Sequence, residues 1–199
     1  MSTSLKAVNE PVRSYDSGSD DRKNLQIKYD QMASKVVEIP LIIGGKEVKT
    51  FEQGQCVMPH DHQHVLGNFH MAGENEVGEA IKSSMLAWNT WSTTFLRERT
   101  KIFRKAAELL QGPWRDTINA ATMLNQSKNA FQAEIDAACE LIDFFNFNCK
   151  YAEDIHNNQP LISPEGVKNS LEYRPLEGFV FAITPFNFTS IAGNLPCAP

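Results

Sequence analysis

The sequence of 199 residues lacks the cysteine pairs that mark zinc-binding and disulfide-rich proteins. No two of its four cysteines form a C-x-x-C pair; they are Cys56, Cys139, Cys149 and Cys197. This wide spacing predicts neither a zinc knuckle nor a disulfide framework. A reducing compartment therefore fits the sequence best.

Long apolar runs and clustered positive charge are also missing. No stretch approaches the roughly 18 apolar residues of a membrane-spanning helix. The 19 Lys and Arg are scattered and outnumbered by 24 Asp and Glu, which gives a formal net charge of −5. Proteins that bind nucleic acid gather their basic residues on one face, so we expect neither a nucleic-acid partner nor membrane insertion. The N-terminus has no secretory apolar core and no Arg-rich transit segment.

One stretch near the C-terminus predicts a ligand site. Residues 178–183 are mostly apolar and uncharged, which is typical of a strand buried on both faces of a parallel sheet. Pro185 cannot donate to a sheet ladder, so we expect the chain to leave the sheet at the carboxyl end, where doubly wound folds bind ligands. Asn187 follows there, and its uncharged amide can hold an oxygen that becomes negative during a reaction. The stretch predicts an enzyme with an α/β fold.

The preceding chain predicts an arm, a hairpin and a helical unit. Residues 1–35 are polar and fit an extended arm with a short helix near 25–32. The β-branched run 36–43, the turn at Gly44-Gly45 and the alternating residues 46–51 predict a surface hairpin. Apolar residues at spacings of three and four predict four helices, at about residues 74–91, 96–110, 114–125 and 130–155. Residues 160–177 predict a linker with an exposed strand at 170–174.

Three other patterns each have two interpretations. His60, His62 and His64 could share one face of a strand and bind a metal, but no Cys or Glu completes a ligand set, so a polar loop is favoured and no metal is expected. The apolar face of the last helix fits a packed core better than a cofactor box. Glu134 and Glu140 could form a carboxylate pair for acid–base chemistry, or belong to a solvated helix surface, which is the reading that we adopt.

Several motifs carry a resemblance to a known family. The run ITPFNF at residues 183–188, after a hairpin and four helices, resembles the aldehyde dehydrogenase superfamily. The runs QAEIDAA (132–138), ELIDFF (140–145), LEGF (176–179) and GNL (193–195) are similar to the branch of it that oxidises glutamate semialdehyde, as are residues 4–6 and 9–12. The resemblance implies the N-terminal part of an aldehyde dehydrogenase fold, with residues 36–159 in the cofactor domain and a Rossmann-like sheet that begins at residue 178.

The resemblance also implies an activity. It is the NAD-dependent oxidation of L-glutamate γ-semialdehyde (1-pyrroline-5-carboxylate) to L-glutamate, a step of proline breakdown in the mitochondrial matrix, by a homo-oligomer. Asn187 matches the family's asparagine that stabilises the oxyanion formed when a cysteine thiolate adds to the aldehyde. Thr184, Pro185 and Phe186 match positions that contact the cofactor. Phe188 matches an aromatic residue beside the aliphatic chain of the aldehyde.

Some residues that the family needs are not in this sequence. The nucleophilic cysteine, the general-base glutamate and the glycine-rich cofactor segment are expected beyond residue 199. Cys197 is the nearest thiol to Asn187 in the sequence, and we expect it to pack rather than to attack the aldehyde. The chain is thus expected to be the N-terminal part of a longer enzyme and inactive alone. The alternatives are a non-catalytic product that acts at most as an interaction partner, and an aldehyde dehydrogenase with another substrate.

Overall fold

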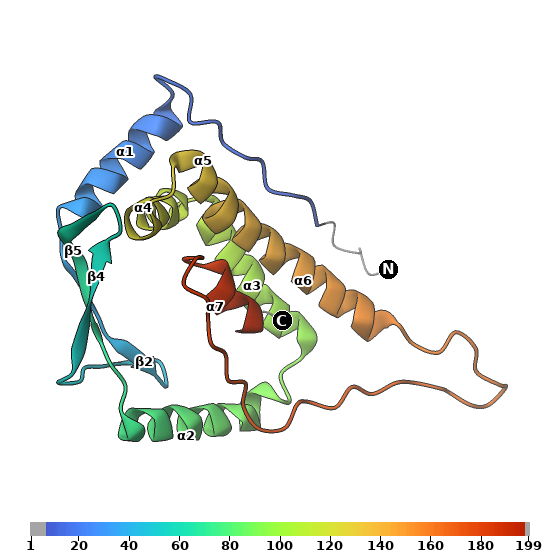
Figure 1. Ribbon diagram of the computed structural model, residues 1–199. Helices are drawn as coiled ribbons and strands as arrows, with labels where there is room; N and C mark the ends of the chain where they lie inside the picture. Colours follow the sequence, from blue (N-terminus) through green and yellow to red (C-terminus); the bar gives the residue numbers. More distant parts are fainter. Residues whose placement is uncertain (1–6, 198–199) are drawn as a thin grey trace.

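The computed structural model describes residues 7–197, without the side chain of Cys197. The motif at residues 4–6 and the packing role expected of Cys197 therefore lie outside the described part. Figure 1 shows a helical unit, a small sheet beside it, and a long connection that leads back to short C-terminal helical turns. The α/β class is confirmed. No helix among the described residues has the length and apolar character needed to cross a bilayer.

The three-stranded sheet has the order β1-β5-β4. Strand β1 (Val37–Ile39) is parallel to β5 (Asp61–His70), and β4 (Gln53–Met58) is antiparallel to β5. The favoured prediction of a polar loop at residues 60–64 is wrong, because residues 61–64 belong to β5. Asp61 pairs with Met58 of β4, residues 62–64 lie in an irregular part of the ladder, and residues 61–63 are exposed. The strand therefore forms without the apolar alternation that would have predicted it.

The predicted surface hairpin is confirmed over residues 41–48, whereas residues 37–39 of its expected first strand form β1 and pair with β5. It consists of β2 (Leu41–Ile43) and β3 (Lys46–Val48), which pair in antiparallel fashion. Gly44 and Gly45 join them with φ angles of 59° and 75°. Tight two-residue turns between strands favour positive φ at both positions, which glycine adopts without a steric penalty.

The four predicted helices are confirmed to within two residues at each end. The arm also contains a helix, α1 (Asp20–Ala33), that is longer than predicted and capped by Ser19, whose Oγ accepts from the Arg22 N–H at 3.2 Å. The last predicted helix is continuous but includes a π-helical turn, η1, between α5 and α6. The bounds are α2 Glu74–Trp91, α3 Leu96–Gln111, α4 Arg115–Gln126, α5 Ala130–Ala133, η1 Glu134–Cys139 and α6 Glu140–Asn157.

The main apolar cluster lies between α3 and α6. The short helix α7 (Ile191–Asn194), followed by a 3₁₀ turn at Leu195–Cys197, closes it with Ile191. The rings of Phe103 and Phe145 meet there with centroids 5.8 Å apart. The buried members of the cluster are Ala107, Leu141, Ile142, Phe145 and Ile191. The apolar face of α6 is thus a packed core, as predicted.

The N-terminal arm is fastened to the helices at two places. Tyr15 packs with Leu25 of α1 and Ala120 of α4 in a second buried cluster. Nearer the N-terminus, the backbone N–H of Glu10 donates to Asp143 Oδ1 of α6 at 2.6 Å. The arm is therefore part of the fold and not a free extension.

The strands predicted at residues 170–174 and 178–183 do not form in this chain. All strands in the described residues lie between Val37 and His70. A parallel strand needs a neighbour to complete its hydrogen bonds, and these stretches have none beside them, so both run as irregular, exposed chain. In Figure 1 this connection leaves the end of α6, passes α2 and returns to α7. Trp88 Nε1 of α2 holds it by donating to Leu176 O at 2.6 Å.

Candidate active site

The predicted site residues lie together where the connection turns back onto the helices. Phe186 and Asn187 form the tip of a turn, and Phe186 is 95% exposed. Thr184, Pro185 and Asn187 are also exposed, whereas Phe188 is half-buried. Within residues 7–197 no group hydrogen-bonds to the side-chain amide of Asn187. Its donors are therefore free to hold an anionic oxygen.

Lys128 contacts the turn that contains Asn187. Helix α4 ends at Ser127, which has a left-handed φ of 53°, and the chain direction changes there so that Lys128 reaches the turn. Lys128 Nζ donates to the backbone oxygen of Asn187 at 3.0 Å and to Asp136 Oδ2 at 2.7 Å. The same ammonium lies 4.7 Å from the centroid of the Phe188 ring, within the range of a cation–π contact.

Gln126, the last residue of α4, binds the same turn. A side-chain amide can be rotated by half a turn without changing its shape. In the orientation that matches donors with acceptors, Gln126 Nε2 donates to Asn187 O at 2.9 Å. Its oxygen then accepts from the N–H groups of Phe188 at 3.3 Å and Thr189 at 3.0 Å. The backbone that follows the Asn187 side chain is thereby fixed.

A contact with the π-helical turn anchors the segment just beyond. Ser190 is 3% exposed, and its Oγ donates to Ala137 O of η1 at 3.1 Å. Phe188 and Ile191, on either side of it, pack against the main apolar cluster. π-Helical turns offer backbone carbonyls outside the regular i→i−4 pattern and are frequent at functional sites. The Asn187 turn is thus held by contacts from Gln126, Lys128 and the π-helical turn, while its tip stays exposed.

Glu134 is not on a helix surface, so that interpretation of the sequence is wrong. It is fully buried in η1 and binds Arg115 Nη2. The Tyr15 hydroxyl and Asn119 Nδ2 each donate to its Oε2 at 2.7 Å, and the Arg13 N–H donates to Oε1 at 2.8 Å. Burial alone would raise the pKa of Glu134, but these hydrogen bonds and the charge of Arg115 lower it to about 2. Because both of its oxygens accept hydrogen bonds from the rest of the fold, this carboxylate stabilises the fold and is unsuited to proton transfer.

Glu140, the other acid considered, is half-buried at the start of α6. Burial raises the pKa of Glu140, and the nearby carboxylate of Asp136 adds to the effect. It lines an open pocket of about 430 Å³ with Asn9 and Asp143. Because Glu134 is committed to Arg115, the two glutamates do not work as an acid–base pair.

The histidines of the sequence bind different partners. The Nδ1 atom of His60 lies 2.7 Å from Ser127 Oγ, and His64 Nε2 lies 2.7 Å from Ala33 O. His70 is buried, with Nδ1 2.8 Å from the Thr50 N–H. The described residues contain no group of three His, Cys, Asp or Glu that could hold a metal ion. The contact of His60 instead fixes the end of α4 next to Lys128.

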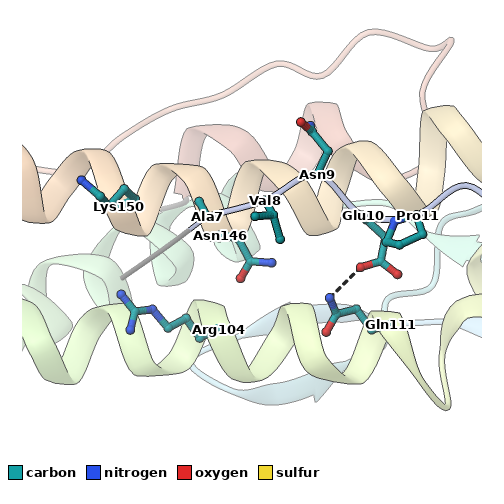
Figure 2. Close-up of a pocket in the computed structure, with 9 residues that line it drawn as sticks. All are labelled: Ala7, Val8, Asn9, Glu10, Pro11, Arg104, Gln111, Asn146 and Lys150. Atoms are coloured by element: carbon teal, nitrogen blue, oxygen red, sulfur yellow. Dashed lines mark hydrogen bonds between the residues drawn. The ribbon is translucent and has the colours of Figure 1, made fainter. Parts of the chain in front are cut away.

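A pocket of about 330 Å³ lies between the arm, α3 and α6, away from the Asn187 turn (Figure 2). Gln111 Nε2 closes one end by donating to Glu10 Oε2 at 2.6 Å. The two cations on its walls are already paired, Arg104 with Glu153 and Lys150 with Asp154. Nothing in this pocket therefore favours an anionic ligand over water.

The site and the fold define a class of protein. A profile of the aldehyde dehydrogenase family matches residues 47–199, which include the helices from α2 to α7 and the Asn187 turn. The chain belongs to the aldehyde dehydrogenase family.

Its relatives are more specific. Over 192 residues the chain is 46% identical to the "probable delta-1-pyrroline-5-carboxylate dehydrogenase" of Schizosaccharomyces pombe, covering 96% of this chain and 35% of that protein. It is 44% identical over 197 residues to the mitochondrial delta-1-pyrroline-5-carboxylate dehydrogenase of Homo sapiens, with coverages of 99% and 35%. The chain thus spans about a third of the length of these curated relatives.

A solved structure agrees with these relatives. The crystal structure of the delta-pyrroline-5-carboxylate dehydrogenase of Mycobacterium tuberculosis bound with NAD matches the chain with a TM-score of 0.93 and 46% identity. The match covers 96% of this chain and 36% of that one. The chain therefore has the fold of the N-terminal part of an aldehyde dehydrogenase.

Proposed function

We propose that the chain is the N-terminal part of an NAD-dependent dehydrogenase that oxidises L-glutamate γ-semialdehyde (1-pyrroline-5-carboxylate) to L-glutamate. The observation that carries the proposal is the 46% identity, at a TM-score of 0.93, with the NAD-bound Mycobacterium tuberculosis enzyme. The free amide of Asn187, presented on a rigid turn, supports it, because acyl-transfer chemistry needs a fixed donor for an oxyanion.

In this proposal Asn187 is the catalytic residue that the chain itself contributes. Its amide donates to the oxyanion that forms when a thiolate, supplied from beyond residue 199, adds to the aldehyde. The half-buried ring of Phe188 lies beside the aliphatic chain of the substrate. Because the ring is held between Lys128 and the apolar cluster, it offers a fixed apolar wall.

Thr184, Pro185 and Phe186 form the proposed wall of the NAD site. Their side chains are exposed, and within residues 7–197 the N–H groups of Thr184 and Phe186 make no hydrogen bond. Both features fit a surface against which a large cofactor lies. NAD, when bound, supplies the hydride acceptor of the reaction.

The compartment and assembly belong to the same proposal. We place the full-length enzyme in the mitochondrial matrix, because human and rat relatives are named mitochondrial, although the Schizosaccharomyces pombe relative is not. We also propose that residues 160–177 join a strand of a partner subunit and that residues 178–183 pair within a sheet completed by the rest of the enzyme. The backbone of both stretches is exposed and forms no ladder in this chain. Sedimentation of the full-length enzyme tests the oligomer.

A substrate panel tests the activity. The full-length gene product that contains residues 1–199 is assayed for NADH formation with glutamate semialdehyde, a simple aliphatic aldehyde and an aromatic aldehyde. We expect the highest kcat/KM with glutamate semialdehyde. A preference for either of the other aldehydes would identify another aldehyde dehydrogenase, and no NADH formation with any of them would contradict the proposal altogether.

A second candidate is a non-catalytic product that acts as an interaction partner. The exposed apolar side chains of the connection favour it, because a patch of this kind on an isolated chain promotes association. Leu161 is 101% exposed, Ile183 is 83% exposed and Phe181 is 77% exposed. An open reading frame that ends after Pro199 would support this candidate, and one that continues into a cysteine motif would support the enzyme.

A further inference from the structure

The Lys128 side chain is more buried than those of the lysines that form surface pairs on α3. Only 18% of its side chain is exposed, against 62% for Lys101 and 66% for Lys105. An ammonium group has three donors. Two of them point to Asp136 Oδ2 and to the backbone oxygen of Asn187, and the charge lies over the Phe188 ring.

The contact with Asn187 is made to its backbone and leaves its side chain free. The Asn187 carbonyl belongs to the peptide group that follows the Asn187 side chain, so a cation that fixes this oxygen also restricts the orientation of the residue. Asp136 holds the ammonium from the opposite side and keeps it in place. Asp136 lies in η1, next to Ala137, whose carbonyl oxygen accepts from Ser190. Two neighbouring residues of the π-helical turn thus hold the segment that follows the Asn187 side chain, Asp136 through Lys128 and Ala137 through Ser190.

Orientation matters because an oxyanion donor acts only at short range. A displacement of about 1 Å at a reacting group can lower the rate about 100-fold. We propose that Lys128 is a positioning residue: it sets the direction of the Asn187 amide, through the backbone, without contacting the reacting atoms. The inference rests on the proposed role of Asn187 as the oxyanion donor.

The test compares Lys128→Met with Lys105→Met in the full-length enzyme. Methionine keeps the length of the lysine stem and removes the ammonium. We expect Lys128→Met to lower kcat between about 10-fold and 100-fold, with the KM for NAD unchanged, and Lys105→Met to leave both unchanged. Lys128→Arg keeps a cation at the carbonyl and is expected to recover part of kcat. The thermal midpoint of each variant shows that it is folded.

The double variant Lys128→Met/Asn187→Ala separates positioning from a general structural role. If Lys128 acts through Asn187, the double variant has the same kcat as Asn187→Ala alone, because the amide that Lys128 directs is already gone. A further multiplicative loss in the double variant would overturn the inference, as would an unchanged kcat in Lys128→Met. If Asn187→Ala itself retained full kcat, the proposed role of Asn187 would fail first.

Discussion

Among single residues, Glu134 joins three parts of the chain. It binds the arm through Tyr15, α4 through Arg115, and lies itself in η1. Arg115 also binds Glu10 and donates to Pro11 O at 2.8 Å. A buried charge that loses its partner is strongly destabilising, because the remaining charge is left without solvent. This carboxylate is therefore one of the main anchors of the arm.

Replacing Glu134 with Gln changes the stability and its pH dependence. The pKa of Glu134 is lowered from 4.5 to about 2 in the folded state, so its contribution is complete above about pH 4.5 and is lost as the pH falls towards 2. A depression of this size corresponds to about 3 kcal/mol. We expect Glu134→Gln to be less stable than the wild type at neutral pH, with a difference that shrinks below about pH 4.5.

Thermal unfolding of the full-length protein over this pH range measures the difference. The control is Glu79→Gln, which changes an exposed glutamate of α2 that pairs with Lys82 at 3.5 Å. The control is expected to follow the wild type at every pH. A stability difference for Glu134→Gln that stays constant down to acid pH would contradict the conclusion that Glu134 is ionised in the folded protein.

Asn187→Ala tests the proposed catalytic residue. Removal of one oxyanion donor typically lowers kcat by about 10²–10³-fold, or about 2.7–4 kcal/mol. We expect a loss of this size in the full-length enzyme, with little change in the dissociation constant of NAD, because the alanine removes a contact made only in the transition state. Asn157→Ala, at the exposed end of α6, is the control. Equal kcat values for the two variants would reject the role of Asn187.

The contacts that hold the Asn187 turn were the least predictable feature of the site. The sequence predicts Asn187 because it follows a proline at the end of an apolar run, and the family resemblance supplies the other expected site residues. Lys128 and Gln126 were missed, since they lie 59 or more residues earlier in the chain and meet the turn only through folding. The change of direction at Ser127 depends on a left-handed backbone at a serine, for which the sequence offers no glycine signal.

At the scale of elements, the hairpin turn shows how local backbone chemistry specifies structure. A Cβ atom at Gly45 meets no atom within 4 Å, so a side chain is disfavoured there by the φ of 75° alone. Gly78 lies within α2 and also has open space around it. A Cβ atom therefore has space at both glycines, but only Gly45 has a positive φ.

Alanine at these two positions is expected to shift stability in opposite directions. Gly45→Ala places a Cβ on a positive φ and is expected to destabilise the protein by about 1 kcal/mol. Gly78→Ala removes a flexible residue from a helix and is expected to stabilise it by up to about 1 kcal/mol. Thermal midpoints of the two variants, measured side by side, check the prediction. Shifts of the same sign would show that φ is not what matters at Gly45.

Helices were predicted well because their apolar faces repeat every three to four residues. The π-helical turn within the last helix was not, since the apolar residues on either side of it keep the spacings of three and four that are typical of an ordinary α-helix. The β4–β5 hairpin was missed because polar side chains occupy the start of β5. The strand at residues 178–183 was predicted from its apolar side chains, but strand formation requires a partner that this chain does not place beside it.

At the scale of the whole molecule, the connection between α6 and α7 is the part that the chain leaves uncovered. Its apolar side chains at Leu161, Ile162 and Leu176 are at least 81% exposed. Few tertiary contacts hold it, among them the hydrogen bonds from Trp88 to Leu176 O and from Tyr173 to Ile155 O. Segments with exposed backbone and few packed neighbours open at low free-energy cost.

Limited trypsin digestion tests how this connection is covered. In residues 1–199 alone we expect rapid cleavage after Lys168, which is exposed in the connection and is followed by Asn169. In the full-length protein we expect this site to be protected, because the proposed sheet and subunit contacts bury this backbone. The helical sites after Lys101 and Lys105 serve as the internal comparison. Equal cleavage of the connection in both proteins would contradict its burial in the complete enzyme.

The arm also sets an order of events during synthesis. Arg13 leaves the ribosome before Glu134, because the carboxylate that accepts from the Arg13 N–H is 121 positions further along the chain. At about 5–20 residues per second, translation needs roughly 6 to 24 seconds to supply that acceptor. The Asp143 carboxylate, which accepts from the Glu10 N–H, is made later still, so the arm gains its full set of anchors only after most of the helical unit has been synthesised.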